Sequence, residues 1–579
     1  MFNTITTFVL SRSRVLDAMT GQTRRRARPP PPRPNSTSRR RRAIARATMR
    51  ARLISALAAV VIVLTVTLTT TLLLIRKDGA LDNAQCATTS TATGNFFPSS
   101  ARLSANATTT GSATALVEPS VAFSVTYDNT FKVVRTLAHS TGVPAKTYVL
   151  YQCGTTAPSV DADGTAFASG TQFFSVPVTK MATGLTIAIG FIEELGLRSK
   201  VSVVDPGSVH APCWQEDEET GDMKGVDAYA DFNYTLGAYD PSAAWTTATT
   251  DLDLVITDRW NVAASGTTKD VNFDASEAPL GMLDRLEYVK FLSLFYNMEK
   301  EANAYYADQV SRWEYMRDRI TYAQSKNKIA SSYTCAWVAD QSYTYKGSDG
   351  NDVSVVSFVV SFAQFEKDIC TGVGLTTFVP SAATSGATTY SYSSMADFHA
   401  AIANVNVIFD KTYYGTPSTT TKAIVYAKLG FDQPSASSIK ALSSEGTILR
   451  MDKRVSDADP LVTHSNAAEG LDWFESSFAH PALVLSDLSR LVWLDTVDGI
   501  DAPQAGCPRF FRDIKADDTV VKTTAADCPV YDAARTSGTC DKQLDEQRVT
   551  LDKLYGYSAS ASVSVTVSLL VAFAMALMT

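Results

Sequence analysis

Histidines are the first candidates for metal chemistry in this 579-residue chain. The chain has only 5 of them, and no two stand at the H-x-x-x-H spacing that would place two ring nitrogens on one helix face. A metal site would therefore need long-range convergence, for example of His210 with Tyr151 or with an acidic residue. Such a set of ligands would suit Fe(III) or Zn(II).

Sequence motifs for catalysis are missing. The chain contains no G-x-S-x-G elbow, no H-E-x-x-H motif, no G-x-x-x-x-G-K phosphate loop and no G-x-G-x-x-G loop. Paired acids such as Glu193 and Glu194 are more typical of a solvated surface than of an acid–base pair. We therefore expect no enzymatic activity, and the sequence assigns no cofactor.

All 8 cysteines lie beyond residue 85. An even number of cysteines in an oxidising compartment favours disulfide bonds, and the absence of any C-x-x-C pair argues against a zinc ribbon or a thioredoxin-like site. Asn106 and Asn233 begin glycosylation sequons, which are expected to face the same extracellular or lumenal compartment as the cysteines.

Short apolar runs alternate with helical patterns along the middle of the chain. This alternation predicts largely parallel sheets covered by helices. Pro481 should divide a helical pattern over residues 470–494, because proline cannot continue the hydrogen-bond ladder. The predicted strands are 173–178, 201–205 and 252–258 in the first half, with a helix at 185–195 between the first two, and 333–338, 353–362 and 405–409 in the second half.

One long helix is predicted between these two halves. Apolar residues from Leu286 to Ile320 step by three or four, and neither proline nor glycine interrupts them. A helix of ~35 residues spans ~50 Å, which exceeds what one small sheet can cover. The predicted fold is therefore α/β, with two Rossmann-like lobes bridged by a single long helix.

The termini carry membrane signals. Residues 1–52 hold fourteen arginines and one acid, a net charge of +13, whereas the rest of the chain sums to −20. The uncharged run 53–75 is long enough to cross a bilayer, with the basic arm on the cytosolic side. The uncharged end of the chain, 554–579, resembles a GPI-attachment signal or a second span, and both alternatives stay open.

The predicted organisation follows from these patterns. It is, in order, a disordered basic cytosolic arm (1–52), a transmembrane signal-anchor (53–75), a Ser/Thr-rich stalk (76–120), an N-terminal α/β lobe (121–283), a bridging helix (284–325), a C-terminal α/β lobe (326–505), a cysteine-bearing annex (506–545) and an apolar tail (546–579). The predicted localisation is single-pass in a membrane, with the main body extracellular or lumenal and the anchor uncleaved.

Several sequence phrases carry a resemblance to a known family. They are YVLYQCG at 148–154, FIEELGL at 191–197, PCWQ at 212–215, FYNMEKEAN at 295–303 and DWFES at 472–476. Their order resembles periplasmic or extracellular solute-binding proteins of the iron-siderophore, haem and cobalamin class, in a membrane-tethered eukaryotic form. The resemblance implies two lobes joined by one rigid helix, with a ligand between them. It also implies a transporter or receptor partner, for which Glu193 is a candidate contact.

Loops that follow parallel strands are where such a fold binds ligands. Aromatic side chains there would stack on a flat solute, and Arg259 would meet an anionic chelate. Within the motif order of the first lobe, Cys153 and Cys213 are the expected disulfide pair. The candidate ligand-binding residues are Tyr151, Thr183, Trp214, Arg259 and Trp260 in the first lobe, and Trp337, Phe362, Tyr413 and Tyr414 in the second.

The expected function is capture of a small solute in an interlobe cleft for uptake, the solute being an iron chelate, haem, cobalamin or a metal. Two alternatives remain: an adhesion or signalling protein that reuses the two lobes, and a metal-dependent enzyme on the same scaffold. No nucleic-acid partner is expected.

Overall fold

The computed structural model describes ten stretches of the chain, all within the segment Ala80–Thr579, which forms one compact unit. The predicted arm (1–52), the predicted span (53–75) and the predicted tail (546–579) lie outside the described residues, as does Asn106. The described stretches are residues 85–90, 94–103, 122–136, 145–207, 209–233, 238–258, 269–347, 350–458, 469–494 and 510–529.

The N-terminal lobe is built on a five-stranded parallel sheet in the order β11-β10-β5-β6-β7. The chain starts in the middle at β5, adds β6 and β7 on one side and then β10 and β11 on the other, which is a doubly wound, Rossmann-like order. The central strands are runs of buried residues, as a sheet covered on both faces requires. The elements are β5 Met181–Thr183, α3 Ile189–Glu194, β6 Val201–Val204, α4 Pro212–Thr220, β7 Lys224–Gly225, α5 Ala243–Thr249, β10 Leu254–Thr257 and β11 Asp270–Asn272.

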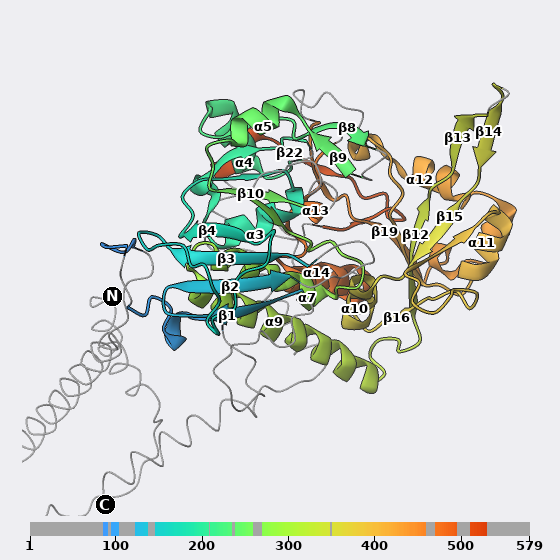
Figure 1. Cartoon of the computed structure of the whole chain (residues 1–579). Helices are drawn as coiled ribbons and strands as arrows, with labels where there is room; N and C mark the ends of the chain where they lie inside the picture. The colour runs from blue at the N-terminus through green and yellow to red at the C-terminus, as the bar shows by residue number, and fades with distance from the viewer. Residues whose placement is uncertain are drawn as a thin grey trace, which may run out of the picture. The chain divides into compact units, whose positions relative to one another are not determined.

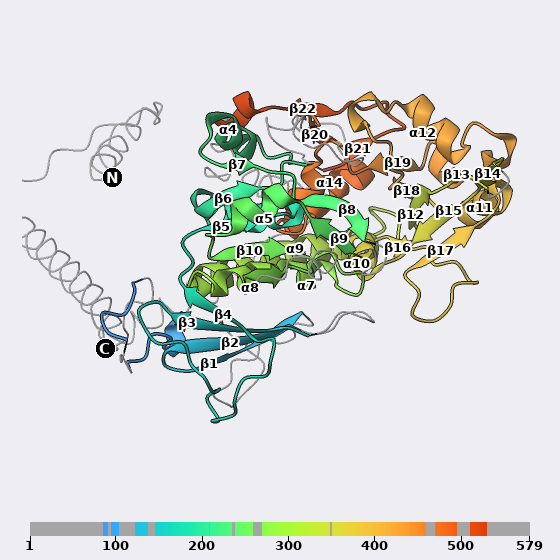
Figure 2. The ribbon, with the colours of Figure 1, turned by 45° about the horizontal axis from the view of Figure 1, so that its top comes forward.

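A separate four-stranded sheet precedes this lobe, and the sequence patterns predicted only its last strand, at 173–178 (Figure 2). Its aromatic side chains pack edge-on against the bridging region: ring centroids lie 5.3 Å apart for Phe123 and Phe291 and 5.4 Å apart for Phe174 and Phe295. Phe97, inside the predicted stalk, is also fully buried. The strands are β1 Phe123–Tyr127, β2 Phe131–Thr136, β3 Thr147–Gln152 and β4 Gln172–Val176.

The C-terminal lobe has a mixed sheet in the order β17-β15-β12-β18-β19-β21, with β16 beside β12. Strands β12, β18 and β19 are parallel, whereas β15, β17 and β21 run antiparallel to their neighbours. This lobe is therefore only partly Rossmann-like. Its elements are β12 Thr334–Asp340, β15 Phe358–Ser361, α10 Gln364–Gly372, β16 Thr376–Thr377, β17 Thr389–Tyr392, α11 Met395–Ile402, β18 Val407–Asp410, α12 Lys422–Leu429, β19 Thr447–Arg450 and β21 Arg512–Asp513.

The bridge between the lobes is a long helix, α9 Glu299–Ser325, of 27 residues (Figure 1). The fold class is thus α/β with two lobes and a long connecting helix, as predicted. The predicted continuity from Leu286 to Ile320 is wrong, because two shorter helices, α7 Met282–Leu286 and α8 Tyr288–Leu294, precede α9.

The break before α9 has a local and a long-range cause. Asn297 adopts a left-handed backbone with φ of 56°, which ends a right-handed helix. The carbonyl of Leu294 accepts a hydrogen bond from Lys132 Nζ at 2.6 Å. Because Lys132 also pairs with Glu299 at 2.6 Å, the start of α9 is fixed by a lysine on β2.

The C-terminal part of the chain returns from the second lobe to the first. Strands β20 Arg454–Ser456 and β22 Val521–Thr523 pair in parallel, and helix α13 Asp472–Ser476 packs against α3. Helix α14, Pro481–Ser489, begins at this proline, so the predicted division there is confirmed, and it packs along α9.

The predicted single-pass membrane localisation is corrected. Among the described residues, no helix combines the length and the apolar character that a membrane crossing requires. The 27-residue α9 is long enough, but charged side chains are spread along it.

Candidate functional site

The carboxyl ends of parallel strands from both lobes lead to one junction. The loop after β6 presents the carbonyl of Val209, which accepts a hydrogen bond from Ser456 Oγ at 2.8 Å on β20, just beyond the end of β19. In the first lobe, Asp205 at the end of β6 accepts hydrogen bonds from the backbone of Gly207 and Ala228 at 2.8 and 3.1 Å. The edges where open α/β sheets bind ligands therefore meet here.

A buried cluster lies at this junction, formed by His210 after β6 and by Asp472 and Glu475 on α13. His210 Nδ1 is 3.8 Å from an Asp472 oxygen and 3.9 Å from a Glu475 oxygen, and all three side chains are buried. The other ring nitrogen of His210 contacts Thr523 Oγ1 at 2.8 Å. One imidazole and two carboxylates, each offering an atom within 4.8 Å of the others, are a ligand set suited to a metal.

Glu475 also holds the cluster's backbone in place. Its two oxygens accept hydrogen bonds from the backbone N–H groups of His210 and Ala211, the second at 2.8 Å. Burial raises the pKa of Glu475 well above its usual range, the two backbone donors lower it, and the charges of Asp472 and Glu193 raise it further.

The second lobe contributes a buried ion network at the ends of β18 and β19. Arg450 pairs with Asp410 at 2.5 Å and with Asp452 at 2.6 Å, and Arg512 pairs with Asp452 at 2.7 Å. Tyr414 donates to Asp410 at 3.1 Å, and its ring lies 4.3 Å from the Arg450 guanidinium carbon. Burial raises the pKa of Asp452, but the two guanidinium groups lower it to below its usual value. The network fixes the loop that follows β18.

The predicted ligand-binding residues do not gather at one place. Three of them lie at strand ends on the junction-facing edges: Thr183 is the last residue of β5 in the first lobe, and Tyr413 and Tyr414 follow β18 in the second. Tyr413 is 71% exposed, whereas Thr183 is buried and bonded to the backbone of Leu185. Only Tyr413 is therefore open to a solute as it stands.

The remaining predicted aromatics are packed within the fold. Trp214 is fully buried and donates to Glu193 at 3.2 Å, and Trp337 stacks on Phe409 with ring centroids 4.2 Å apart. Phe362 is buried, and Tyr151 is half-buried against Phe131 and Phe167 on the outer face of the first sheet. Arg259 and Trp260 lie outside the described residues.

Burial also removes Glu193 as a contact for a transport partner. It is 4% exposed, and its carboxylate is turned towards Trp214 rather than towards solvent. Sequence spacing did not reveal this, because Glu193 stands beside Glu194 in a pattern typical of a surface pair.

One exposed aromatic at the junction was missed in sequence. Phe474 is 52% exposed on α13, between Trp473, which packs into the second lobe against Phe511 at 5.2 Å, and Glu475, which reaches the first lobe. The phrase DWFES was recognised as a motif, but only the structure shows that Phe474 is exposed while its four other residues are buried.

A pocket of 310 Å³ lies along the bridging helix. It lies where α7, α9 and α10 meet, with Trp313 in its wall and side chains of both charges around it: Asp284, Arg317, Lys367 and Asp368. Burial raises the pKa of Asp368, which accepts a hydrogen bond from the backbone of Met282 at 2.8 Å.

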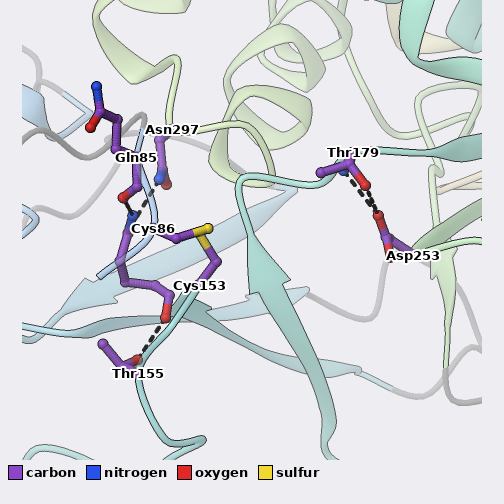
Figure 3. The surroundings of a disulfide bond; sticks show 8 residues. Gln85, Cys86, Cys153, Thr155, Thr179, Asp253 and Asn297 are labelled. Carbon is purple, nitrogen blue, oxygen red and sulfur yellow. Dashed lines mark hydrogen bonds between the residues drawn. A yellow bond between two sulfur atoms is a disulfide. The ribbon is translucent and has the colours of Figure 1, made fainter. Parts of the chain in front are cut away.

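The predicted Cys153–Cys213 disulfide is wrong. Cys153 pairs with Cys86, and Figure 3 shows this bond beside Gln85 and Asn297. Cys213 pairs with Cys528, across 315 positions of sequence. A third disulfide joins Cys335 to Cys370. Cys153 lies directly after β3 and Cys213 lies on α4, and each meets a segment that comes from far along the chain.

No protein-family model and no curated protein matches the chain. Similar solved structures include a periplasmic heme-binding protein from Pseudomonas aeruginosa, at 14% identity and a TM-score of 0.34, covering 59% of this chain and 99% of that one. Another is a periplasmic binding protein from Veillonella parvula, at 14% identity and a TM-score of 0.35, covering 56% and 93%. A third is the FhuD protein from S. pseudintermedius, at 11% identity and a TM-score of 0.36, covering 57% and 97%.

At such low identities and TM-scores, these similarities identify neither the family nor the ligand of this chain. Two of the three structures are named as periplasmic binding proteins. Cobalamin and a eukaryotic membrane-tethered form, which the motif resemblance implied, appear in none of the three names.

Proposed function

We propose that this protein captures a small solute between its two lobes, where the carboxyl edges of the two sheets meet. The observation that carries this proposal is the contact of Ser456 with Val209, because it joins the loop after β6 to the segment after β19. In open α/β sheets this edge is the usual place for a ligand.

The chemistry at the junction favours a solute with a flat or aromatic face. Tyr413 and Phe474 are large exposed aromatic side chains on segments next to the junction, and both can stack on a planar group. An iron chelate, haem or cobalamin presents such a face, and a free metal does not. Capture for uptake, with a transporter or receptor as partner, is the role we propose for such binding.

A ligand-dependent thermal shift of the full chain tests this proposal. The panel holds a ferric catecholate, a ferric hydroxamate, haem, cobalamin and free metal ions. A ligand that binds only the folded state stabilises it by about 2.7 kcal/mol at a hundredfold excess over Kd. A concentration-dependent rise in Tm with one of the two iron chelates, haem or cobalamin supports the proposal. No shift with any of these four contradicts it, whatever the free metal ions do.

A further inference from the structure

We propose that His210, Asp472 and Glu475 form a binding site for a resident divalent transition-metal cation, with zinc as the first ion to test. This site goes beyond the proposed solute binding, because the cation would be part of the folded protein rather than its cargo.

The separations fit a metal better than they fit direct hydrogen bonds. At 3.8 and 3.9 Å, the distances from His210 Nδ1 to Asp472 and to Glu475 exceed the hydrogen-bond range. A tetrahedral zinc ion with bonds of ~2.0 Å places its ligand atoms ~3.3 Å apart. Movements of about 0.5 Å would bring His210 Nδ1 to that separation from each carboxylate. The two carboxylate oxygens, which lie within 4.8 Å of each other, would have to close to the same separation.

The contacts of the other ring nitrogen orient the imidazole for this role. Thr523 Oγ1 lies 2.8 Å from His210 Nε2 and 3.2 Å from the carbonyl of Val455. The hydroxyl has one hydrogen, and donating it to the carbonyl leaves its oxygen to accept from Nε2–H. In the neutral ring Nδ1 then carries the lone pair and faces the two carboxylates, as in metal sites whose histidine donates its second N–H to a neighbouring oxygen.

The residue types select the class of cation. Imidazole with carboxylates suits zinc and its first-row neighbours, whereas calcium and magnesium prefer oxygen ligands alone. Three protein ligands leave one position for water or for the second oxygen of a carboxylate. The full burial of the three side chains favours a retained ion over an exchanging solute.

The location gives the ion a structural task. His210 lies three positions before Cys213, whose disulfide partner Cys528 lies five positions after Thr523. The cation would join the loop after β6 to α13, beside a disulfide that already ties α4 to the last described segment. Together they would hold the returning chain against the first lobe at the edge of the solute site.

The experiment measures metal content and cobalt absorption of the full chain. The protein is purified from zinc-supplemented medium, passed over a desalting column and analysed by mass spectrometry for metals. We expect about one zinc ion per chain. After chelation and addition of Co²⁺, a visible absorption band typical of four-coordinate cobalt should appear.

Two histidine variants separate this site from general metal affinity. His210→Gln should lower zinc content at least tenfold and abolish the cobalt band. His399→Gln is the matched control, because His399 is equally buried but contacts Ser435 and Leu429 in the other lobe. It should retain both signals. If circular dichroism shows that His210→Gln is misfolded, Asp472→Asn takes its place.

Wild-type protein without stoichiometric zinc and without a cobalt band would overturn the proposal whatever the variants do. A folded His210→Gln or Asp472→Asn protein that keeps the metal would overturn it as well. Solute binding is measured separately by the thermal-shift panel, so either proposal can fail without the other.

Discussion

The ion pair that sets the start of the bridging helix offers the sharpest stability prediction. Lys132 and Glu299 are both fully buried, and their charged atoms are 2.6 Å apart. Lys132→Met leaves the Glu299 carboxylate buried without this lysine. Breaking a buried ion pair in this way costs about 3–5 kcal/mol of unfolding free energy. The lost hydrogen bond to the Leu294 carbonyl adds to that cost.

The double variant Lys132→Met/Glu299→Leu separates the charge effect from the packing effect. Burial raises the pKa of Glu299 although Lys132 opposes this, and burial lowers the pKa of Lys132 although Glu299 opposes that. Desolvation therefore outweighs attraction for both partners. An apolar pair of similar volume should restore most of the lost stability or exceed the wild type by about 1–4 kcal/mol.

The pH dependence of Lys132→Met follows from the sign of the Glu299 shift. A raised native pKa means that the folded state binds the proton more tightly, so stability is gained below the unfolded pKa and lost as pH rises through the folded pKa. Removing Lys132 removes a positive charge and raises the pKa of Glu299 further. The difference in unfolding free energy between Lys132→Met and the wild type should therefore be smaller at pH 5 than at pH 8.

Urea unfolding followed by circular dichroism measures these differences through the midpoint and the slope. Lys346→Met is the control, because Lys346 pairs with Asp352 at 2.9 Å on an exposed hairpin where both side chains are more than half exposed. Such a surface pair contributes little. A Lys132→Met midpoint equal to that of Lys346→Met would refute the reasoning.

Two further stability predictions concern the second lobe and the long-range disulfide. Asp452→Asn should cost about 3–5 kcal/mol, because Arg450 and Arg512 would lose a buried carboxylate. The pKa of Asp452 is lowered in the folded state, so its contribution to the unfolding free energy is present above the unfolded pKa and is lost as pH falls. Acidification should therefore destabilise the wild type more than it destabilises Asp452→Asn. The pair of substitutions Cys213→Ser and Cys528→Ser opens a loop of 315 positions and should lower unfolding free energy by up to about 5 kcal/mol, measured in urea; an unchanged midpoint would contradict the structural role of this disulfide.

The sheets were predictable where burial is uniform along a strand. Runs such as Leu254–Thr257 contain consecutive buried aliphatic residues, and the sequence pattern reflects this directly. In the second lobe, β15 lies inside the predicted run 353–362, whereas β17 was not predicted. The antiparallel direction of β15 could not be predicted, because the direction of pairing leaves no signal in a short strand. Of the first sheet only the last strand, at 173–178, was predicted. Buried and partly exposed residues mix along β1 and β3, so these strands lack the uniform apolar run that marks β10.

The break in the bridging helix depends on residues distant in sequence. The apolar stripe from Leu286 continues through Asn297 without a proline or glycine, so local pattern predicts one helix. The group that competes for the helix carbonyl is Lys132, 162 positions earlier. Disulfide pairing failed similarly, because Cys213 finds its partner 315 positions away.

The sequence indicated which types of residue could form the candidate site, but not which residues meet there. His210 was expected to need an acid from elsewhere, and Asp472 and Glu475 supply the acids, but nothing local links them to the histidine. Trp214 and Trp337 follow the general tendency of large aromatics to be buried. Tyr413 remains the predicted binding residue whose position is open to a ligand.

A calorimetric titration of the full chain with the best ligand from the panel tests solute capture most directly. Tyr413→Ala should weaken binding about tenfold, because a stacked aromatic contributes more than ~1 kcal/mol. Tyr343→Ala is the matched control, since Tyr343 is 57% exposed on the β13 strand Tyr343–Lys346 of a separate hairpin. Capture between the lobes predicts saturable binding that Tyr343→Ala leaves unchanged. Equal loss in both variants, or no binding by the wild type, would contradict it.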